Sequence, residues 1–472
     1  KQIMKKLFYT TFIILIFILV LITLILSTLG IETDKFNKFI TNKAVENNKS
    51  ILLKLDKVNF KFDIKDFNLF LETKKPEFTY KNLKIPIQNV RVYLDFYSLI
   101  KSKSKVDKIN ITTEEININQ LKKIIIKTKP SNLNSLISNK VKNGKLIINL
   151  ELYFNDNLEV ENFIAKGQVK EMSVVINKDL TAKKASFNFF GDSSDILVKN
   201  IKSELPGILI KDGNLQITRN NEINLKSEFS SEIAINKKNI INYLPFFKKI
   251  KLINIETNLN TKLDNFLNIT FDKTFKVTDY EYTNKGVINN SVFKFEKPFQ
   301  ILFLEKDIEK LFLKDTNFKV RYAKDKKNYI HSLGIYSVDD KNYQNYDFKN
   351  NFLNETLDID LNFEFIQKLK IDFINYKKDN NKIAKIFLDI YKKKDRIELR
   401  KFYYQESKNQ INIEKLKIDK NSLISLQKVK VKTYDNNNLK NDFTLFFGKK
   451  INITGNKYDA KNLNKFLNLK SN

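Results

Sequence analysis

Apolar and polar residues alternate along most of the chain that follows residue 57. In three stretches an apolar side chain occupies every second position, and polar residues fill most positions between them. Side chains two residues apart point to the same face of a β-strand, so the pattern predicts strands with one apolar face. The apolar positions are Val58, Phe60, Phe62 and Ile64; Leu146, Ile148, Leu150, Leu152 and Phe154; and Leu357, Ile359, Leu361 and Phe363, which Phe365 extends.

Short turn signals separate many of these predicted strands. Asp212-Gly213 lies between two apolar pairs and predicts a hairpin, and Asn143-Gly144 precedes the strand that begins near Leu146. The chain has only 6 prolines, so few strands are prevented from pairing. Such short connections favour neighbouring strands that run antiparallel, as in a meander.

Helical spacing is confined to a few windows. Asp34–Val45 places Phe36, Phe39 and Ile40 on one face, which predicts a short amphipathic helix. Lys382–Tyr391 fits both periods, and we assign it to a strand. The other predicted helices are Asn119–Ile126, Ser131–Ile137, Asn239–Phe247, Glu305–Leu313 and Asp459–Leu467.

The predicted strands have more apolar surface than so few helices could cover. Removing apolar surface from water stabilises a protein by about 25 cal/mol per Å², so something must shield these faces. A second sheet, the same sheet curling on itself, or bound hydrocarbon would each do so. Alternation leaves the three arrangements open within a mainly β fold.

The segment from Leu7 to Leu29 is almost wholly apolar. About 20 helical residues cross the hydrocarbon core of a bilayer, so the segment predicts one transmembrane helix. Three lysines precede it, whereas Glu32 and Asp34 are the first charges after it, which favours a cytoplasmic N-terminus and an exported body. A cleaved signal peptide is the alternative, although Ser27–Ile31 matches a cleavage site poorly. We expect a cytoplasmic stub and anchor at residues 1–31 and the body at residues 32–472.

Charge and composition narrow the choice of partners. The chain has 84 Lys and Arg against 54 Asp and Glu, a net charge of +30. This excess would suit an anionic lipid surface or nucleic acid. The joint abundance of Lys, Asn, Ile and Phe is also typical of an AT-rich genome, and we attribute most of the charge to codon usage and expect no nucleic-acid partner. The absence of cysteine excludes disulfides and thiolate metal sites.

Residue patterns that carry enzymatic chemistry are scarce. His331 is the only histidine, so an H-E-x-x-H zinc motif is impossible and a Ser-His-Asp triad would need this residue. None of the 10 glycines forms a G-x-G or Walker A pattern. Asp358 and Asp360 could hold a divalent cation, but a solvated strand face accounts for them without a ligand. We expect no enzymatic activity, no cofactor and no metal site.

Several segments occur in the order typical of a known family. The apolar segment ends in Ser27–Thr33, with the sequence STLGIET, and alternating strands follow directly. Val92–Lys101, VYLDFYSLIK, leads to Val106–Ile111, VDKINI, and Ile453–Ala460, ITGNKYDA, precedes an apolar helical window. In these features the chain resembles the AsmA-like superfamily, which includes the AsmA, TamB and YhdP proteins. The likeness covers most of the chain at the level of architecture, and the chain lacks the C-terminal portion of the large members.

The resemblance implies an elongated, twisted antiparallel sheet curled into an apolar groove. It implies a single-pass protein of the bacterial inner membrane, with a periplasmic body that binds or conducts phospholipid towards the outer membrane. The three apolar sets given above would then line the groove. A structural or assembly factor for outer-membrane biogenesis, which binds outer-membrane or periplasmic proteins, is the alternative.

Overall fold

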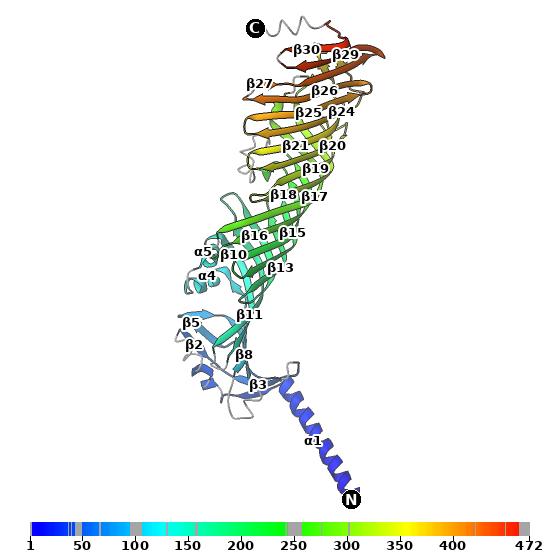
Figure 1. The fold of residues 1–472 in the computed structure, drawn as a ribbon. Coiled ribbons are helices and arrows are strands. Elements are labelled where there is room, and N and C mark those ends of the chain that lie inside the picture. Colours follow the sequence, from blue (N-terminus) through cyan, green and yellow to red (C-terminus); the bar gives the residue numbers. More distant parts are fainter. Residues whose placement is uncertain are drawn as a thin grey trace. The chain divides into compact units, whose positions relative to one another are not determined.

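Antiparallel β-sheet dominates the structure (Figure 1). A computed structural model of the chain describes residues 2–35, 37–38, 40–42, 50–65, 68–94, 106–128, 131–155, 159–240, 243, 257–274, 276–300, 303–420, 422–448 and 450–461. Among these residues the main sheet contains 25 strands, and the helices are the N-terminal α1 (Gln2–Thr28) and a few short ones. The mainly β class, the apolar N-terminal helix and the short helices are therefore confirmed.

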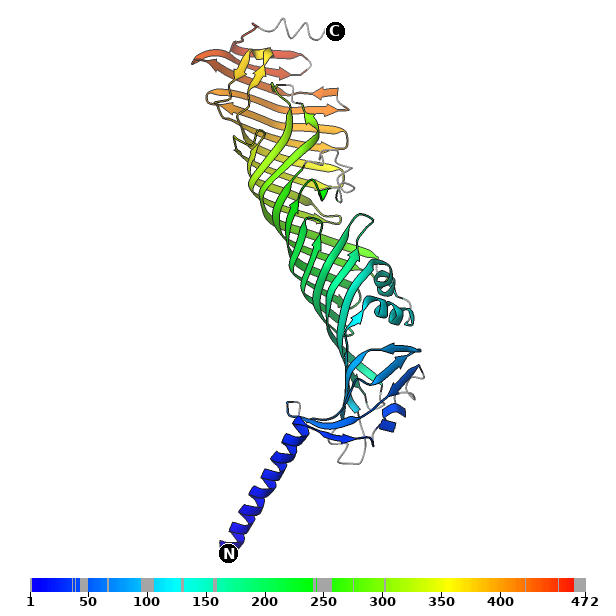
Figure 2. The ribbon, with the colours of Figure 1, turned by 180° about the vertical axis from the view of Figure 1, so that it is seen from behind.

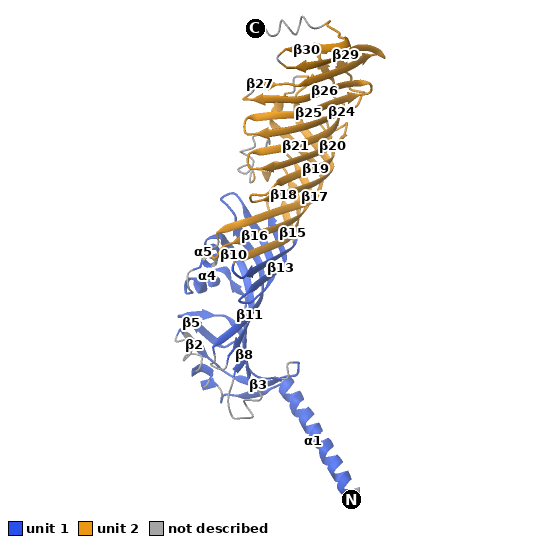
Figure 3. Ribbon diagram, viewed as in Figure 1, with its two compact units in different colours: residues 1–204, 212–221 blue, residues 205–211, 222–472 orange. Residues whose placement is uncertain are grey.

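The chain divides into two compact units, which Figure 3 shows in different colours. Unit 1 comprises residues 1–204 and 212–221, and unit 2 comprises residues 205–211 and 222–472. Strand β14 (Ile208–Arg219) contributes residues to both units.

In unit 1 the strands of the sheet pair mainly with their neighbours in sequence. The three strands β2 (Ile51–Lys54), β5 (Glu77–Tyr80) and β6 (Leu83–Ile85) form a separate small sheet. The strand β9 (Ile116–Asn117) pairs with the start of β10. The main antiparallel order is β1 (Ile31–Thr33), β3 (Val58–Asp63), β4 (Asn68–Lys74), β7 (Ile87–Leu94), β8 (Val106–Thr113), β10 (Val141–Phe154), β11 (Val160–Val175), β12 (Thr181–Gly191) and β13 (Asp195–Leu205).

In unit 2 the strands also form a meander. A short excursion between β21 and β24 comprises β22 (Leu369–Ile371), the 3₁₀ turn η2 (Asp372–Ile374) and β23 (Tyr376–Lys378). The main antiparallel order is β15 (Ile223–Ile235), β16 (Leu259–Phe271), β17 (Val277–Phe299), β18 (Ile308–Ala323), β19 (Asn328–Ser337), β20 (Gln344–Leu353), β21 (Thr356–Phe365), β24 (Ala384–Lys393), β25 (Arg396–Glu406), β26 (Asn409–Asp419), β28 (Lys428–Asp435), β29 (Asn438–Phe447) and β30 (Ile451–Lys457), with β27 (Ser422–Ser425) also paired to β26.

Two short helices pack beside the start of β10 in unit 1 (Figure 2). They are α4 (Ile118–Ile126) and α5 (Asn132–Lys140), and they confirm the windows predicted at residues 119–126 and 131–137. Asn117 begins α4 with a capping box, because its side chain accepts from the Gln120 N–H and the Gln120 side chain accepts from the Asn117 N–H.

Two predicted turns are wrong. Asp212-Gly213 lies inside the continuous strand β14, where Asp212 has a φ of 51°. Asn143-Gly144 lies inside β10, between shifts in the pairing register with β11. A residue with positive φ can interrupt the regular pairing of a strand without reversing the chain, as the register shifts beside Asn143 show.

One predicted helix is also wrong. Residues 308–313 of the window Glu305–Leu313 belong to β18, where Phe312 pairs with Val292. Pairing with β17 holds this apolar segment in a strand. Local spacing contains no information about that pairing, so it could not distinguish a helix from a strand here. The strand predicted at Lys382–Tyr391 is confirmed as β24. The helices predicted at Asp34–Val45, Asn239–Phe247 and Asp459–Leu467 lie partly outside the described residues.

Candidate functional site

One face of the unit 1 sheet is apolar in register from strand to strand. Residues directly opposite each other in antiparallel strands point to the same side of the sheet. An entirely apolar row begins at Ile31, next to α1, and crosses seven strands. Its members are Ile31, Phe60, Leu71, Val92, Ile109, Leu152 and Phe163. We call this row and its neighbours on the same side the unit 1 face; the neighbours are Val58, Phe62, Leu69, Val90, Leu94, Ile111, Leu146, Ile148, Leu150, Ala165, Val169, Phe187, Phe189, Ile196 and Val198.

Burial changes along this face. Between β3 and β7, Val58, Leu71 and Val92 are fully buried in a core that also includes Leu94, and Ile40 and Leu55 pack against it. From β8 to β13 the apolar side chains named above are half-buried, whereas Ile116, opposite Leu146, and Ala185 in β12 are buried. A residue between two packed layers is fully buried, as Val58 is at 1% exposure. The second stretch therefore has the burial of a surface that lacks a complete covering layer.

The structure brings together two of the apolar sets identified in the sequence. Residues from Leu146 to Leu152 share the unit 1 face with Phe60 and Phe62, although about 90 residues separate them in sequence. The prediction that Ile64 shares the apolar strand face of Val58, Phe60 and Phe62 is wrong. Strand β3 ends at Asp63, and Ile64 lies in the following turn with 54% exposure. Phe154 follows a register shift at the end of β10 and pairs with Val160.

The opposite side of the unit 1 sheet carries paired charges. Lys61 Nζ and Arg91 Nε each lie 2.8 Å from a carboxylate oxygen of Glu72, which is buried. Burial raises the pKa of Glu72, but hydrogen bonds from Lys61 and Arg91 outweigh it and hold the pKa below its ordinary value. Lys166 pairs with Glu151 on the same side at 3.1 Å. These charges face away from the unit 1 face, on a side that also carries the buried, stacked rings of Phe70 and Tyr93.

In unit 2 an apolar face is partly covered. One row of direct cross-strand neighbours is fully buried, and β22, η2 and β23 supply Ile374 and Tyr376 to the same core. The next row is half-buried. The buried row is Ile386, Tyr404, Ile411, Val431 and Phe443; the half-buried row is Leu361, Leu388, Phe402, Ile413, Val429 and Leu445.

The covering segment, residues 369–378, is held by specific hydrogen bonds. We call it the strap. Its contacts with neighbouring strands and with the C-terminal segment are Tyr376 Oη with Tyr404 Oη at 2.7 Å and with Glu406 Oε2 at 3.0 Å, Asn441 Nδ2 with Ile374 O at 2.8 Å, and Tyr458 Oη with Phe373 O at 2.9 Å.

The third apolar set of the sequence lies on this unit 2 face. Leu357, Ile359 and Leu361 are half-buried, and Phe363 packs against the core beneath the strap. The strap could not be predicted from local spacing, because β22 and β23 are three residues long and show no measurable period.

Polar side chains interrupt the unit 2 face in β15 to β17. Asn265 is buried and donates from Nδ2 to Ser231 Oγ at 3.0 Å, while Tyr282 Oη donates to Asn265 Oδ1 at 2.7 Å. Asn284 Nδ2 donates to Tyr282 Oη at 3.0 Å. Sequence reasoning missed this cluster, although Ser231 and Asn265 occupy positions where the alternation calls for apolar residues.

Of the two carboxylates considered as a cation site, Asp358 and Asp360, the first contacts an arginine. Asp358 and Asp389 both contact the Arg400 guanidinium, the second at 2.6 Å. His331 Nε2 lies 2.9 Å from Asp347 Oδ1. Within the described part of the chain, no group of three or more His, Cys, Asp or Glu residues is arranged to hold a metal ion.

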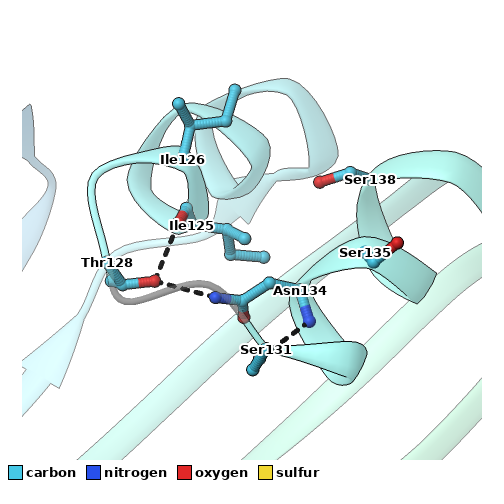
Figure 4. A pocket seen from close by; sticks show the side chains of 7 residues that line it. All are labelled: Ile125, Ile126, Thr128, Ser131, Asn134, Ser135 and Ser138. Carbon is cyan, nitrogen blue, oxygen red and sulfur yellow. Dashed lines mark hydrogen bonds between the residues drawn. The ribbon is translucent and has the colours of Figure 1, made fainter.

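A small hollow lies between α4 and α5 (Figure 4). Its volume is about 260 Å³. Thr128 Oγ1 donates to Ile125 O at 2.7 Å and accepts from Asn134 Nδ2 at 3.0 Å, and Ser131 caps α5. These polar groups serve the ends of the helices, and the lining contains no titratable side chain. It is formed by Ile125, Ile126, Thr128, Ser131, Asn134, Ser135 and Ser138.

Comparisons with protein-family models, with curated proteins and with solved structures find no match for this chain.

Proposed function

We propose that this chain is a membrane-anchored protein that binds the acyl chains of phospholipid on the half-buried apolar faces of its sheet. Each unit contributes one such face. The activity is binding and transfer without a chemical step, and it needs no cofactor. In this proposal the protein belongs to the AsmA-like superfamily, resides in a bacterial inner membrane and passes lipid towards the outer membrane.

The half-buried stretch of the unit 1 face carries the proposal. From β8 to β13 it consists mainly of aliphatic and aromatic side chains, with Ala165, Gly167 and Gly191 as small positions, and its named residues carry no charge. A surface of this kind is unfavourable in water by about 25 cal/mol per Å², and acyl chains would cover it. Acyl chains need no hydrogen-bonding partners, so they suit a surface made mainly of apolar side chains.

The anchor supports the same function. The helix Ile3–Thr28 has a mean hydropathy of 2.9 and no buried residue, and it is long enough to cross a bilayer. The apolar row of unit 1 starts at Ile31, three residues after this helix. Lipid leaving the bilayer would therefore meet the apolar face close to the membrane surface.

The test is to measure phospholipid that co-purifies with the full chain and with charged variants. Leu150→Asp and Leu361→Asp each place a carboxylate on a half-buried apolar face. Asn188→Asp and Asn362→Asp place the same charge at exposed positions and serve as matched controls. An unpaired charge against hydrocarbon is strongly unfavourable, so mass spectrometry should find phospholipid with the wild type and the controls and much less with the two leucine variants.

Thermal melting of the same proteins separates binding from folding. The melting temperatures of the leucine variants should lie close to that of the wild type, because a half-buried face has no tightly packed opposing layer that a new side chain could disrupt. Unfolding of both would mean that these positions lie in a closed core. Folded variants with normal lipid content would mean that the faces do not bind lipid.

A structural or assembly role is the second candidate, and β30 favours it. Among the described residues β30 pairs only with β29, and Ile451 and Ile453 are 61% and 67% exposed. An apolar edge strand can accept a strand from another protein. Specific capture of a periplasmic or outer-membrane protein that is lost in Ile453→Lys, from a chain that holds no lipid, would favour this role.

A further inference from the structure

The junction between α1 and the unit 1 sheet is short and tightly packed. The N–H groups of Leu29 and Gly30 donate to Ile25 O at 3.0 and 2.9 Å, which closes the end of the helix. Gly30 has a φ of +73°, and a Cβ at this position would lie 2.7 Å from Lys61 Cγ. Because β1 starts at the next residue, no flexible linker separates α1 from the sheet.

Strand β3 runs back towards the end of α1. Phe60 lies opposite Ile31 and Val58 lies opposite Thr33, so β3 approaches the helix as β1 leaves it. At about 3.3 Å per residue, the last residue of β3, Asp63, lies about 10 Å beyond Phe60 in that direction. Both views of the ribbon show β3 reaching the end of α1 (Figures 1 and 2).

Large apolar side chains are exposed around this junction. The exposed fractions are 76% for Leu29 and 54% for both Ile31 and Ile64. Lys65, which follows Ile64 in the turn, is also exposed. Single exposed apolar residues are common on any protein surface, but these gather at the end of a helix that can span a membrane. Apolar residues beside a lysine suit the boundary between headgroups and acyl chains.

We infer that the turn at Ile64–Lys65 docks on the bilayer surface, with Ile64 inserted at the headgroup boundary and Lys65 against lipid phosphates. The inference rests on the membrane attachment proposed above. It gives Ile64 a role at the membrane in place of the groove position expected from the sequence. Docking would hold Ile31, the first residue of the unit 1 face, at the level of the headgroups.

The test uses the absence of cysteine from the chain. Ile64→Cys in the full chain takes a single environment-sensitive fluorophore, and the protein is reconstituted in vesicles of phosphatidylcholine and phosphatidylglycerol. Ile126→Cys is the matched control, because Ile126 is 73% exposed at the end of α4. The probe at position 64 should show a blue-shifted emission and quenching by headgroup-labelled lipid, and the probe at position 126 should show neither.

Flotation of the same vesicles separates the docking from the anchor. If the labelled chain floats with the vesicles while the probe at position 64 reports water, the docking is refuted and the anchor stands. If the chain fails to float, the membrane attachment and the docking are both refuted. A stronger blue shift with more phosphatidylglycerol supports the contact of Lys65 with phosphate.

Discussion

At the scale of single residues, Lys378 is a buried lysine at the end of the strap. Its side chain is 2% exposed, and Nζ donates to Ile366 O at 2.7 Å, Gln367 O at 3.0 Å and Asp379 O at 3.1 Å. Burial lowers the pKa of Lys378 from 10.5 to about 8. The ammonium ties the end of the strap to the segment after β21, so it stabilises the covered part of the face.

Lys378→Met should lower the melting temperature at neutral pH. The variant leaves three backbone carbonyls without this donor. Each buried carbonyl that loses its hydrogen bond lowers the free energy of unfolding by about 1–3 kcal/mol. Because the folded pKa is depressed, the unfolded chain binds more protons between about pH 8 and pH 10.5, and the contribution of Lys378 to the free energy of unfolding rises across that window.

The free energy of unfolding of Lys378→Met should therefore fall further below that of the wild type as pH rises from 8 towards 10. Melting curves across this range measure it, with Lys377→Met as the control because Lys377 is exposed in the same strand. A deficit that stays constant with pH would contradict the depressed pKa.

Ile64 illustrates the limit of prediction for a residue. Alternation from Val58 to Phe62 was correct, because each of these side chains does lie on one face. The alternation continued by chance into the turn. Outside a strand, a spacing of two residues does not show which way a side chain points. Local periodicity gives the face of a residue inside a strand, but not the residue at which the strand ends.

At the scale of elements, the strap decides which part of the unit 2 face is closed. It covers the row that contains Tyr404 and Ile411 and leaves the row that contains Leu361 half-buried. The half-buried row is the part that we propose for lipid. The strap would then act as a fixed wall of the binding face.

Ile374→Ala tests the packing of the strap. Ile374 is 2% exposed within the core, so its truncation should lower stability by about 2–4 kcal/mol. The measurement is thermal or urea unfolding of the full chain, together with binding of a dye specific for exposed apolar surface, which should increase. Ile383→Ala is the control, because Ile383 is 56% exposed and its truncation should change little. Equal effects of the two changes would show that the strap does not cover a core.

Elements with a clear period were predictable, and covering elements were not. The helices α4 and α5 follow from spacing and caps, whereas the spacing in β24 fitted both a helix and a strand. The burial of Val58 beneath Ile40 and Leu55 depends on contacts between segments that no local period encodes. The polar cluster around Asn265 could have been suspected from the polar residues at apolar positions of β15 and β16, but its hydrogen bonds depend on the register between strands.

At the scale of the whole molecule, the proposed function depends on the direction in which the apolar helix α1 would insert into a membrane. The sequence has lysines before the apolar helix and acidic residues directly after it, which predicts export of everything beyond Glu32. The fold class and the helix were predictable because they follow from composition and local period. The division into two compact units was not, because no linker of distinct composition marks it.

Alkaline phosphatase fused after Asn472 should be active in cells, because this enzyme folds only after export. A reporter that is active only in the cytosol should be silent at the same position. The reverse pair of results would place both faces in the cytosol, away from any lipid route between two membranes.

The measurement that tests the central claim most directly is photocrosslinking to lipid in living cells. A photoreactive phenylalanine analogue replaces Leu150, which is half-buried on the unit 1 face, or Asn188, which is exposed on the opposite side. After illumination and purification, mass spectrometry should detect phospholipid joined covalently at position 150 and none at position 188. Absence of lipid at position 150, or equal capture at both positions, would contradict the proposal that this apolar face binds phospholipid.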